Sequence, residues 1–370
     1  MNKKNIKLIK LLDFKLILNI FLIFIFGIVM LTTATHANQT GNYKEIIKQL
    51  IAFGIGIILI LCTLKIDYSQ IGKHYKIFYI ASIILLLLVW IPGLGKVQEG
   101  SRRWIKLGPL YLQTSELVKL TFIVSYAKIV EKHNGKLNTL KEILPVVLKA
   151  IPVLVLMLMQ PDLGGTIVFG CIMLGMLFTA GLNIKIIRNI GIIVVILLPL
   201  IYTFMAPHQK VRIEAFLHPD DLSYPGNYQV VQSMIAIGSG GLEGKGLYNG
   251  TQNHSGFLPV SESDFIFAVI GEELGLAGMI IVIILYLLFI LRMVKTAGKA
   301  KDFYGTLIII GVSSMFTYQI IQNIGMTMAL IPVTGITLPF ISYGASSLVS
   351  SLASLGLVLN VGMRNKKINF

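Results

Sequence analysis

Residues 258–268 read Leu258-Pro-Val-Ser-Glu-Ser-Asp-Phe-Ile-Phe-Ala268, and a mainly apolar run continues from there to about residue 290. A run of about 20 apolar residues is long enough to cross the hydrocarbon core of a membrane as a helix. Asp264 stands where the polar stretch gives way to this predicted span. Because an ionisable group at membrane depth is costly unless it is used, Asp264 is a candidate functional residue.

The composition extends the membrane prediction to the whole chain. Of the 370 residues, 55% are hydrophobic and 13% are charged, whereas soluble domains carry about 25% charged residues. The apolar runs are long and continuous, which favours helices over a β-barrel. We therefore expect an all-α integral membrane protein that forms one polytopic domain over residues 1–370. About ten transmembrane helices are predicted, near residues 16–34, 49–64, 77–92, 113–130, 145–160, 164–181, 190–206, 265–290, 306–325 and 345–362.

The basic residues predict the orientation of these spans. The chain carries 32 Lys and Arg against 17 Asp and Glu, a formal net charge of +15. Most of the basic residues lie in short loops on one side of the spans, and such loops are typically cytoplasmic. This distribution argues against a nucleic-acid-binding protein. With an even number of spans, it places both the N-terminus and the C-terminus in the cytoplasm.

Three stretches on the opposite side are too long to be simple connections, at about 93–115, 207–264 and 326–347. Long loops in a compact protein are usually functional. The middle stretch is a large extracellular loop that holds no predicted span. The last stretch has two prolines and two glycines at membrane depth. It predicts a re-entrant segment, because irregular backbone there must be buried in protein or line a cavity.

Charged residues in and after the first of these stretches suit a phosphate or pyrophosphate ligand. Arg103 is one of them, and its alternative role is a surface charge that reaches lipid headgroups. Lys119 lies inside a predicted span, where it needs a partner. Glu116 precedes it by three residues, so the two share a helix face. Glu116 could therefore be simply the partner of Lys119.

Two aspartates have both a functional and a structural interpretation. Asp264 is the strongest candidate for a general base, and its alternative is the N-cap of the following helix. Asp162, in the turn Gln160-Pro-Asp-Leu-Gly164, is either a cap or a site residue. The glycine-rich stretch 238–246 departs from the Walker pattern at two positions. We expect it to be a close-packed turn lining the site, with an ordinary loop as the alternative.

Five motifs resemble those of the SEDS family (shape, elongation, division and sporulation), and they cover nearly the whole chain in order. They are Arg102-Arg-Trp-Ile-Lys-Leu-Gly108, Gln113-Thr-Ser-Glu-Leu-Val-Lys119, Gln160-Pro-Asp-Leu-Gly164, Asp264-Phe-Ile-Phe-Ala268 and Pro332-Val-Thr-Gly-Ile-Thr-Leu-Pro-Phe-Ile-Ser-Tyr-Gly344. Within the family, Gly250-Thr-Gln252 resembles the rod-shape (RodA) branch, which serves cell elongation and shape, more than the division (FtsW) branch. A division-specific or sporulation-specific paralogue is the alternative.

The resemblance implies a peptidoglycan glycosyltransferase that polymerises lipid II on the outer face of the cytoplasmic membrane of a bacterium. It also implies a partner, a class B penicillin-binding protein that crosslinks the glycan strands. By motif position, Asp264 takes the place of the family's catalytic aspartate. The substrate-binding residues that the resemblance implies are Arg103, Glu116, Lys119 and Asp162.

The chain departs from the family pattern at three positions. Thr114 stands where the family has proline, Ala345 where it has glycine, and Val260 where it has an acid, for which Glu262 could compensate. The acidic and basic residues of the motifs are retained. We therefore expect activity, in a specialised paralogue.

The resulting hypothesis is an inverting glycosyl transfer in which Asp264 removes the proton of the acceptor hydroxyl. Arg103 and Lys119 would bind the departing undecaprenyl pyrophosphate, and a divalent cation, Mg²⁺ or Mn²⁺, could share that work. A lipid II flippase or other lipid transporter would use the same lipid-binding groups without needing a base. A catalytically silent scaffold for a transpeptidase is a third alternative.

Overall fold

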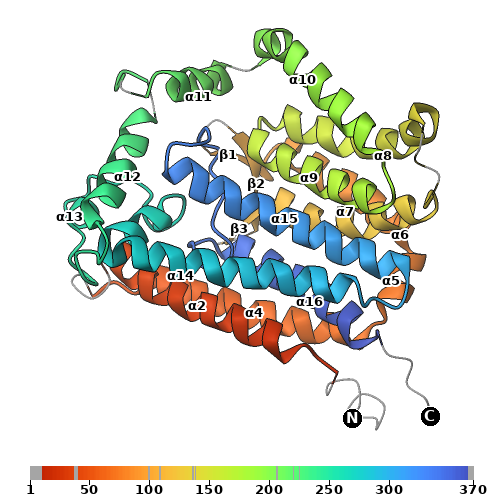
Figure 1. The fold of residues 1–370 in the computed structure, drawn as a ribbon, viewed down its shortest axis with the longest axis horizontal. Helices are drawn as coiled ribbons and strands as arrows, with labels where there is room; N and C mark the ends of the chain where they lie inside the picture. Colours follow the sequence, from red (N-terminus) through yellow and green to blue (C-terminus); the bar gives the residue numbers. More distant parts are fainter. Residues whose placement is uncertain are drawn as a thin grey trace.

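The chain folds into a bundle of long helices in the computed structural model (Figure 1). The structure describes residues 11–36, 41–98, 101–107, 110–135, 137, 139–205, 207–219, 221–224 and 226–365. Each of the ten predicted spans coincides with a helix. These helices are α2 (Phe14–Ala34), α4 (Lys44–Lys65), α6 (Tyr75–Leu87) with the short η1 (Leu88–Trp90), α7 (Thr114–Glu131), α8 (Leu140–Met159), α9 (Leu163–Thr179), α10 (Ile184–Phe204), α14 (Ile266–Ala297), α15 (Phe303–Thr327) and α16 (Ala345–Met363).

Length and composition single out eight of these ten helices. Among the described residues, six helices are long and apolar enough to cross a membrane, namely α2, α4, α8, α14, α15 and α16. The segment formed by α6 and η1 is a shorter apolar helix, and so is α9. The multi-pass helical architecture predicted from the apolar runs is confirmed.

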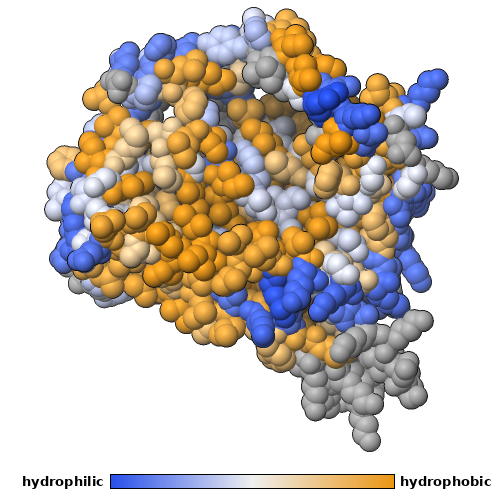
Figure 2. Space-filling model, viewed as in Figure 1, coloured by the Kyte–Doolittle hydropathy of each residue, from blue (hydrophilic) through white to orange (hydrophobic). Residues whose placement is uncertain are grey.

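The inner and outer helices differ in what they bury. α7, α15 and α16 carry side chains such as Phe122, Phe316 and Val358 that are fully buried. α14 instead exposes large apolar side chains, for example Ile280 and Ile284, one turn apart. Figure 2 shows a broad apolar surface over this part of the molecule. A contiguous apolar surface of this extent suits contact with lipid rather than water.

The first outer stretch forms a small antiparallel sheet that the sequence analysis did not predict. Its strands are β1 (Gly95–Gln98), β2 (Ser101–Leu107) and β3 (Leu110–Gln113), in the order β1-β2-β3. β3 runs directly into α7, and Trp104 of β2 pairs with Gln113 at the end of β3. This register places Arg103 beside the start of α7, where the Thr114 hydroxyl donates a hydrogen bond to the Arg103 carbonyl at 3.3 Å.

The predicted large extracellular loop is largely helical. It contains α11 (Pro207–Leu217), α12 (Asn227–Gly240) and the single turn α13 (Thr251–His254). All three are too short to span a membrane, so the prediction that this stretch holds no span is correct. The stretch packs onto the bundle mainly through α12 and α14.

The glycine-rich stretch after α12 packs backbone to backbone against α14. The amide of Gly246 donates to the carbonyl of Glu273 at 2.9 Å, and α14 is broken at Gly275, which has φ 61° and ψ −160°. Only glycine tolerates such close contact and such dihedral angles without strain. A Cβ on Gly240 would lie 1.9 Å from the carbonyl oxygen of Gly271, and one on Gly244 would lie 2.2 Å from that of Glu273.

This packing gives a test of the contact between α12 and α14. The substitution Gly240→Ala should lower the free energy of unfolding by about 1–3 kcal/mol, because the new methyl group forces the helices apart. Gly238→Ala is the matched control, since a Cβ there meets nothing within 4 Å. The thermal unfolding midpoint in detergent should fall for Gly240→Ala and stay level or rise for Gly238→Ala. Equal midpoints for both variants would contradict the close packing.

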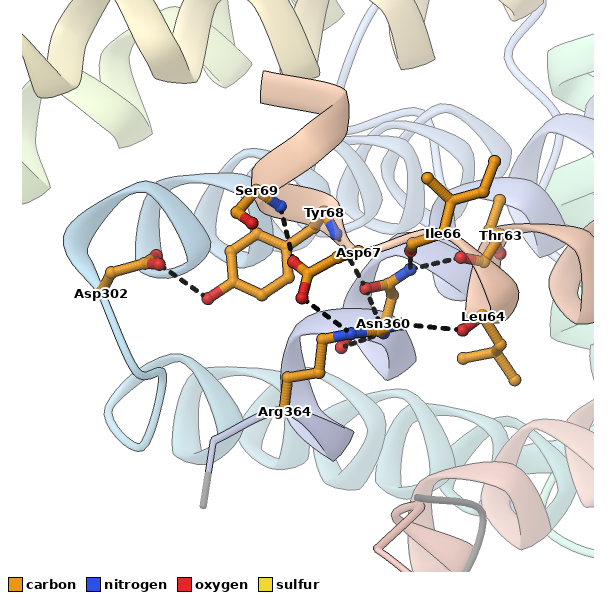
Figure 3. A network of polar contacts seen from close by, with 9 residues as sticks. All are labelled: Thr63, Leu64, Ile66, Asp67, Tyr68, Ser69, Asp302, Asn360 and Arg364. Carbon is orange, nitrogen blue, oxygen red and sulfur yellow. Dashed lines mark hydrogen bonds and ion pairs between the residues drawn. The ribbon is translucent and has the colours of Figure 1, made fainter. Parts of the chain in front are cut away.

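One end of the bundle is held by a polar network at the start of α5 (Tyr68–Lys73) and the end of α16 (Figure 3). The Tyr68 hydroxyl donates to Asp302 at 2.9 Å. The Arg364 guanidinium lies 3.3 Å from Asp67, and the Asn360 amide donates to the carbonyl of Ile66 at 2.7 Å. The network joins the α4–α5 turn, the start of α15 and the end of α16.

Residues near both ends of the chain lie at this same end of the bundle. Arg292 forms an ion pair with Asp13 at 2.7 Å, and Asp13 precedes α2. Residues of the α14 C-terminus and the α16 C-terminus line a shared cavity with Asp13. Residues 1–10 and 366–370 lie outside the described residues, so the cytoplasmic location of the termini stays a prediction.

Within the predicted re-entrant stretch 326–347, residues 328–344 form neither helix nor strand, and all but Met328 and Leu330 are buried or half-buried. Polar side chains from neighbouring elements satisfy its backbone. The Asn323 amide donates to the Ile336 carbonyl at 2.8 Å, and the Gln49 amide donates to the Ser342 carbonyl at 2.9 Å. Such bonds are the condition under which irregular backbone persists at membrane depth.

Candidate active site

The predicted site residues come together around one cavity of about 450 Å³. They arrive from separate parts of the chain: the sheet, α7, the start of α9, and the turn before α14. The wall opposite is formed by α15 and the re-entrant segment. The five residues predicted from the motifs all line this cavity, namely Arg103, Glu116, Lys119, Asp162 and Asp264.

Asp264 lies at the cavity wall without capping α14. The N-cap position of α14 is occupied by Phe265, so the N-cap interpretation of Asp264 is wrong. The side-chain amide of Asn323 holds the backbone of this residue, because it donates to the Asp264 carbonyl at 3.0 Å. The Ser263 hydroxyl donates to its carboxylate at 3.3 Å. These two contacts hold the Asp264 carboxylate at the cavity wall, where it can act on a ligand in the cavity.

Arg103 and Asp162 form an ion pair, with Nη1 and Oδ1 3.4 Å apart. Asp162 is also the N-cap of α9, since its carboxylate accepts from the amide of Gly165 at 2.9 Å. The cap interpretation of Asp162 is therefore confirmed, and the residue also lines the cavity. A capped carboxylate is rigid, and it holds the Arg103 guanidinium at the cavity.

Lys119 and Glu116 form a buried ion pair on α7. The Lys119 ammonium lies 2.7 Å from Glu116 Oε2 and donates to Oε1 at 2.8 Å. The two residues are 4% and 8% exposed. At this depth each charge depends on the other. Glu116 is thus the partner of Lys119, and both also line the cavity.

Further polar side chains line the cavity, among them Lys48, Glu262 and Gln319. Glu262 was noted above only as a substitute for a missing acid. Lys48 and Gln319 were missed. Gln319 is a polar residue inside a predicted span, which is itself a signal that it faces the bundle interior.

The three departures from the family pattern fall at the cavity or beside it. The Thr114 hydroxyl bonds to the carbonyl of Arg103, which a proline could not do. Val260 has φ 55°, a left-handed conformation that is strained for a β-branched residue. Ala345 is the first residue of α16 and lines the cavity. The altered positions therefore shape the cavity wall, and Glu262 lines the cavity beside Val260, the position where the family has an acid.

The glycine-rich stretch does not line this cavity, so that part of its prediction is wrong. It is close-packed as expected, and its lysine is engaged elsewhere. The Lys245 ammonium lies 2.7 Å from the carboxylate of Glu272, which is fully buried. Glu272 also accepts from the amide of Gln252 at 2.8 Å. These bonds fasten the stretch to α14.

Across the described ranges, no three His, Cys, Asp or Glu side chains gather closely enough to hold a metal ion. Protein side chains alone therefore do not form a metal site there. The divalent cation expected from the sequence stays a prediction, and the reaction proposed below uses none.

The fold and the cavity define a class: a multi-pass membrane protein with a charged site at one end of its helix bundle. The family model FTSW_RODA_SPOVE, described as a cell cycle protein, matches residues 14–367. The chain is 35% identical over 353 residues to the probable peptidoglycan glycosyltransferase FtsW of Francisella salina, covering 92% of this chain and 87% of that protein. The chain belongs to the FtsW/RodA/SpoVE family, which is the SEDS family that the motifs resembled.

Solved structures agree with this assignment. A chain of a peptidoglycan synthase complex, described as coordinating polymerization and crosslinking, matches with a TM-score of 0.82 at 27% identity, over 96% of this chain and 98% of that chain. The rod shape determining protein RodA of Thermus thermophilus matches with a TM-score of 0.72 at 28% identity, over 96% and 98%. Relatives of both the division and the rod-shape branches are similar to this chain, so the branch stays a prediction.

Proposed function

We propose that this chain is a peptidoglycan glycosyltransferase that polymerises lipid II into glycan strands on the outer face of the bacterial cytoplasmic membrane. One observation carries the proposal. A carboxylate, Asp264, lines the same 450 Å³ cavity as two cationic side chains, Arg103 and Lys119. A glycosyl transfer to a hydroxyl, with pyrophosphate as the leaving group, needs a base and cations in one site. The name of the FtsW relative supports this activity.

The reaction is a single displacement. Asp264 takes the proton from the 4-hydroxyl of the acceptor GlcNAc, and the oxygen attacks the anomeric carbon of the donor MurNAc. The bond from that carbon to the pyrophosphate oxygen breaks, and undecaprenyl pyrophosphate leaves with the bonding electrons. Attack from the opposite face inverts the α linkage to β, so no covalent nucleophile is needed.

Arg103 and Lys119 are the groups that stabilise the charge on the departing pyrophosphate. In the structure each faces an acid, at 3.4 Å for Arg103 and 2.7 Å for Lys119. Asp162 and Glu116 thereby keep the cations extended and in place. Preformed cations that need no reorganisation are effective where charge develops in the transition state.

The proposed partner is a class B penicillin-binding protein, which would crosslink the strands as they form. The similar chain in a peptidoglycan synthase complex supports this proposal. The match covers 96% of this chain and 98% of that chain, so nearly the whole bundle has a counterpart in that complex.

A vesicle assay separates the proposed enzyme from a lipid II transporter. Purified protein and its partner would be placed in vesicles that carry labelled lipid II in one leaflet. The glycosyltransferase should form glycan strands, and Asp264→Asn should abolish them. A transporter should move lipid II between leaflets at the same rate in both proteins and form no strands.

A further inference from the structure

A second cavity lies at the end of the bundle opposite the active site. It has a volume of about 330 Å³ and is lined by the segment before α2 and by residues at the C-terminal ends of α14 and α16. Asp264 lies just before α14, whereas this cavity borders residues 292–299, around the other end of that helix. Its volume falls within the range of small-ligand sites, about 300–1,000 Å³. None of the residues proposed for glycosyl transfer lines it.

The charges around this cavity do not balance. Arg292, Lys295 and Lys299 are cationic, and Asp13 is the one carboxylate among the described residues that line it. Asp13 is already engaged, because it accepts hydrogen bonds from Arg292 Nε at 2.7 Å and Nη2 at 2.9 Å. A bidentate pair of this kind fixes both side chains and cancels their charges. Lys295 and Lys299 therefore leave a formal excess of two positive charges.

Nearby acids do not neutralise these two lysines. Asp67 and Asp302, at the same end of the bundle, belong to the polar network of Figure 3. Within the described part of the chain, neither lysine forms an ion pair or a side-chain hydrogen bond. The sequences of residues 1–10 and 366–370 contain six lysines but no Asp or Glu. An anion from outside the chain is therefore the counter-charge that this cavity suits.

One face of α14 changes from apolar to cationic as the helix approaches the cavity. Ile284, Leu288 and Leu291 are large apolar side chains that are exposed. Lys295 and Lys299 follow Leu291 at intervals of four residues, and spacings of three or four residues place side chains on one helix face. An exposed apolar stripe thus ends in the two lysines, within the broad apolar surface of Figure 2.

This pattern matches the two parts of a phospholipid. Phosphate oxygens accept strong, charge-assisted hydrogen bonds from Lys and Arg, and acyl chains pack against exposed apolar side chains. Basic pockets between transmembrane helices are typical headgroup sites for anionic lipids. A zwitterionic headgroup carries its own ammonium group, which the lysines would repel. A free phosphate would use the cations but would leave the apolar stripe unused.

We propose that this cavity binds the headgroup phosphate of an anionic phospholipid of the phosphatidylglycerol type, in the leaflet opposite the active site. Lys295 and Lys299 would hold the phosphate oxygens. The carboxamide of Asn365, which also lines the cavity, would donate to the headgroup, and the acyl chains would lie along the apolar stripe of α14. This site takes no part in glycosyl transfer, so its test is independent of the proposed function.

The test titrates a short-chain, water-soluble phosphatidylglycerol into the full-length protein in an uncharged detergent, by isothermal titration calorimetry. Wild type should bind it, and the double variant Lys295→Gln/Lys299→Gln should bind about 30-fold more weakly. This factor corresponds to about fivefold for each lysine, the contribution of a lysine near an anionic membrane surface. Short-chain phosphatidylcholine and inorganic phosphate should each bind wild type at least about tenfold more weakly than phosphatidylglycerol does.

The matched control is Lys65→Gln/Lys73→Gln, which removes the same charge at the same end of the bundle. Lys65 and Lys73 lie in the last turns of α4 and α5, are exposed, and do not line the cavity. This control should keep the wild-type affinity for phosphatidylglycerol. Without lipid, both double variants should unfold at the wild-type midpoint, because exposed surface side chains contribute little to stability. Phosphatidylglycerol should raise the midpoint of wild type and of the control, but not that of Lys295→Gln/Lys299→Gln.

Four results would overturn the proposal. The first is equal affinity of wild type and Lys295→Gln/Lys299→Gln for phosphatidylglycerol. The second is an equal loss in the control, which would mean a general effect of surface charge. Equal binding of phosphatidylcholine would mean that the site does not select an anionic headgroup. Equal binding of inorganic phosphate would mean that it takes a free anion rather than a lipid.

Discussion

Replacing Asp264 with asparagine should reduce the rate of strand formation by about 10²–10⁴-fold, the range expected when a general base is lost. Asparagine keeps the size and the hydrogen-bonding shape of the side chain but cannot accept the proton of the acceptor hydroxyl. The backbone contacts that position residue 264 involve its carbonyl, and the substitution leaves them intact. The affinity for lipid II should therefore change little, while the single-turnover rate falls.

Asp221→Asn is the matched control, because it makes the same chemical change in the same outer segment. Asp221 is exposed, outside the cavity, and accepts a hydrogen bond from the amide of Ser223 at 2.9 Å. Its substitution should leave the rate within about twofold of wild type, as for surface changes generally. Equal losses in the two variants would mean that the Asp264 carboxylate has no special role.

Replacing Lys119 with methionine should cost about 3–5 kcal/mol of folding stability, because it leaves the Glu116 carboxylate buried without its cation. The double variant Glu116→Gln/Lys119→Met removes both charges and should recover most of that loss. It should remain inactive, since the cation proposed to stabilise the leaving pyrophosphate is still absent. Thermal unfolding in detergent and strand formation, measured on the same samples, would separate the two effects.

The same helix supplies the control for this pair. Lys128 and Glu131 are also three residues apart on α7, but they are 28% and 26% exposed. Lys128→Met should cost less than about 1 kcal/mol, as expected for a surface pair. If the double variant were as active as wild type, Lys119 would have a purely structural role.

Apolar run length predicted the spans well, because a span must bury its backbone hydrogen bonds within one helix whatever its neighbours are. All ten predicted spans coincide with helices. The outer stretches were harder to predict. The sheet over residues 95–113 depends on pairing between short strands, and α12 depends on backbone contact with α14 at Gly240 and Gly244. Neither kind of tertiary contact leaves a periodic signal in a short segment.

The site residues also divide into those that the sequence predicts and those that depend on tertiary contacts. Five charged residues were found because charges near a membrane are rare and need a reason, and the motif resemblance gave their order along the chain. Their pairing could be predicted only for Glu116 and Lys119, which are neighbours on one helix. The Arg103–Asp162 pair joins a strand to a helix cap. Gln319 was missed because a neutral side chain in an apolar span gives a weaker signal than a charge.

The most direct test of the central claim is strand formation by the purified wild-type protein with its transpeptidase partner and labelled lipid II. The product is then digested with a muramidase that cleaves β linkages. We expect long strands that the muramidase degrades, and no strands from the Asp264→Asn variant under the same conditions. Strands from Asp264→Asn at the wild-type rate, or none from wild type with any cognate partner, would contradict this expectation.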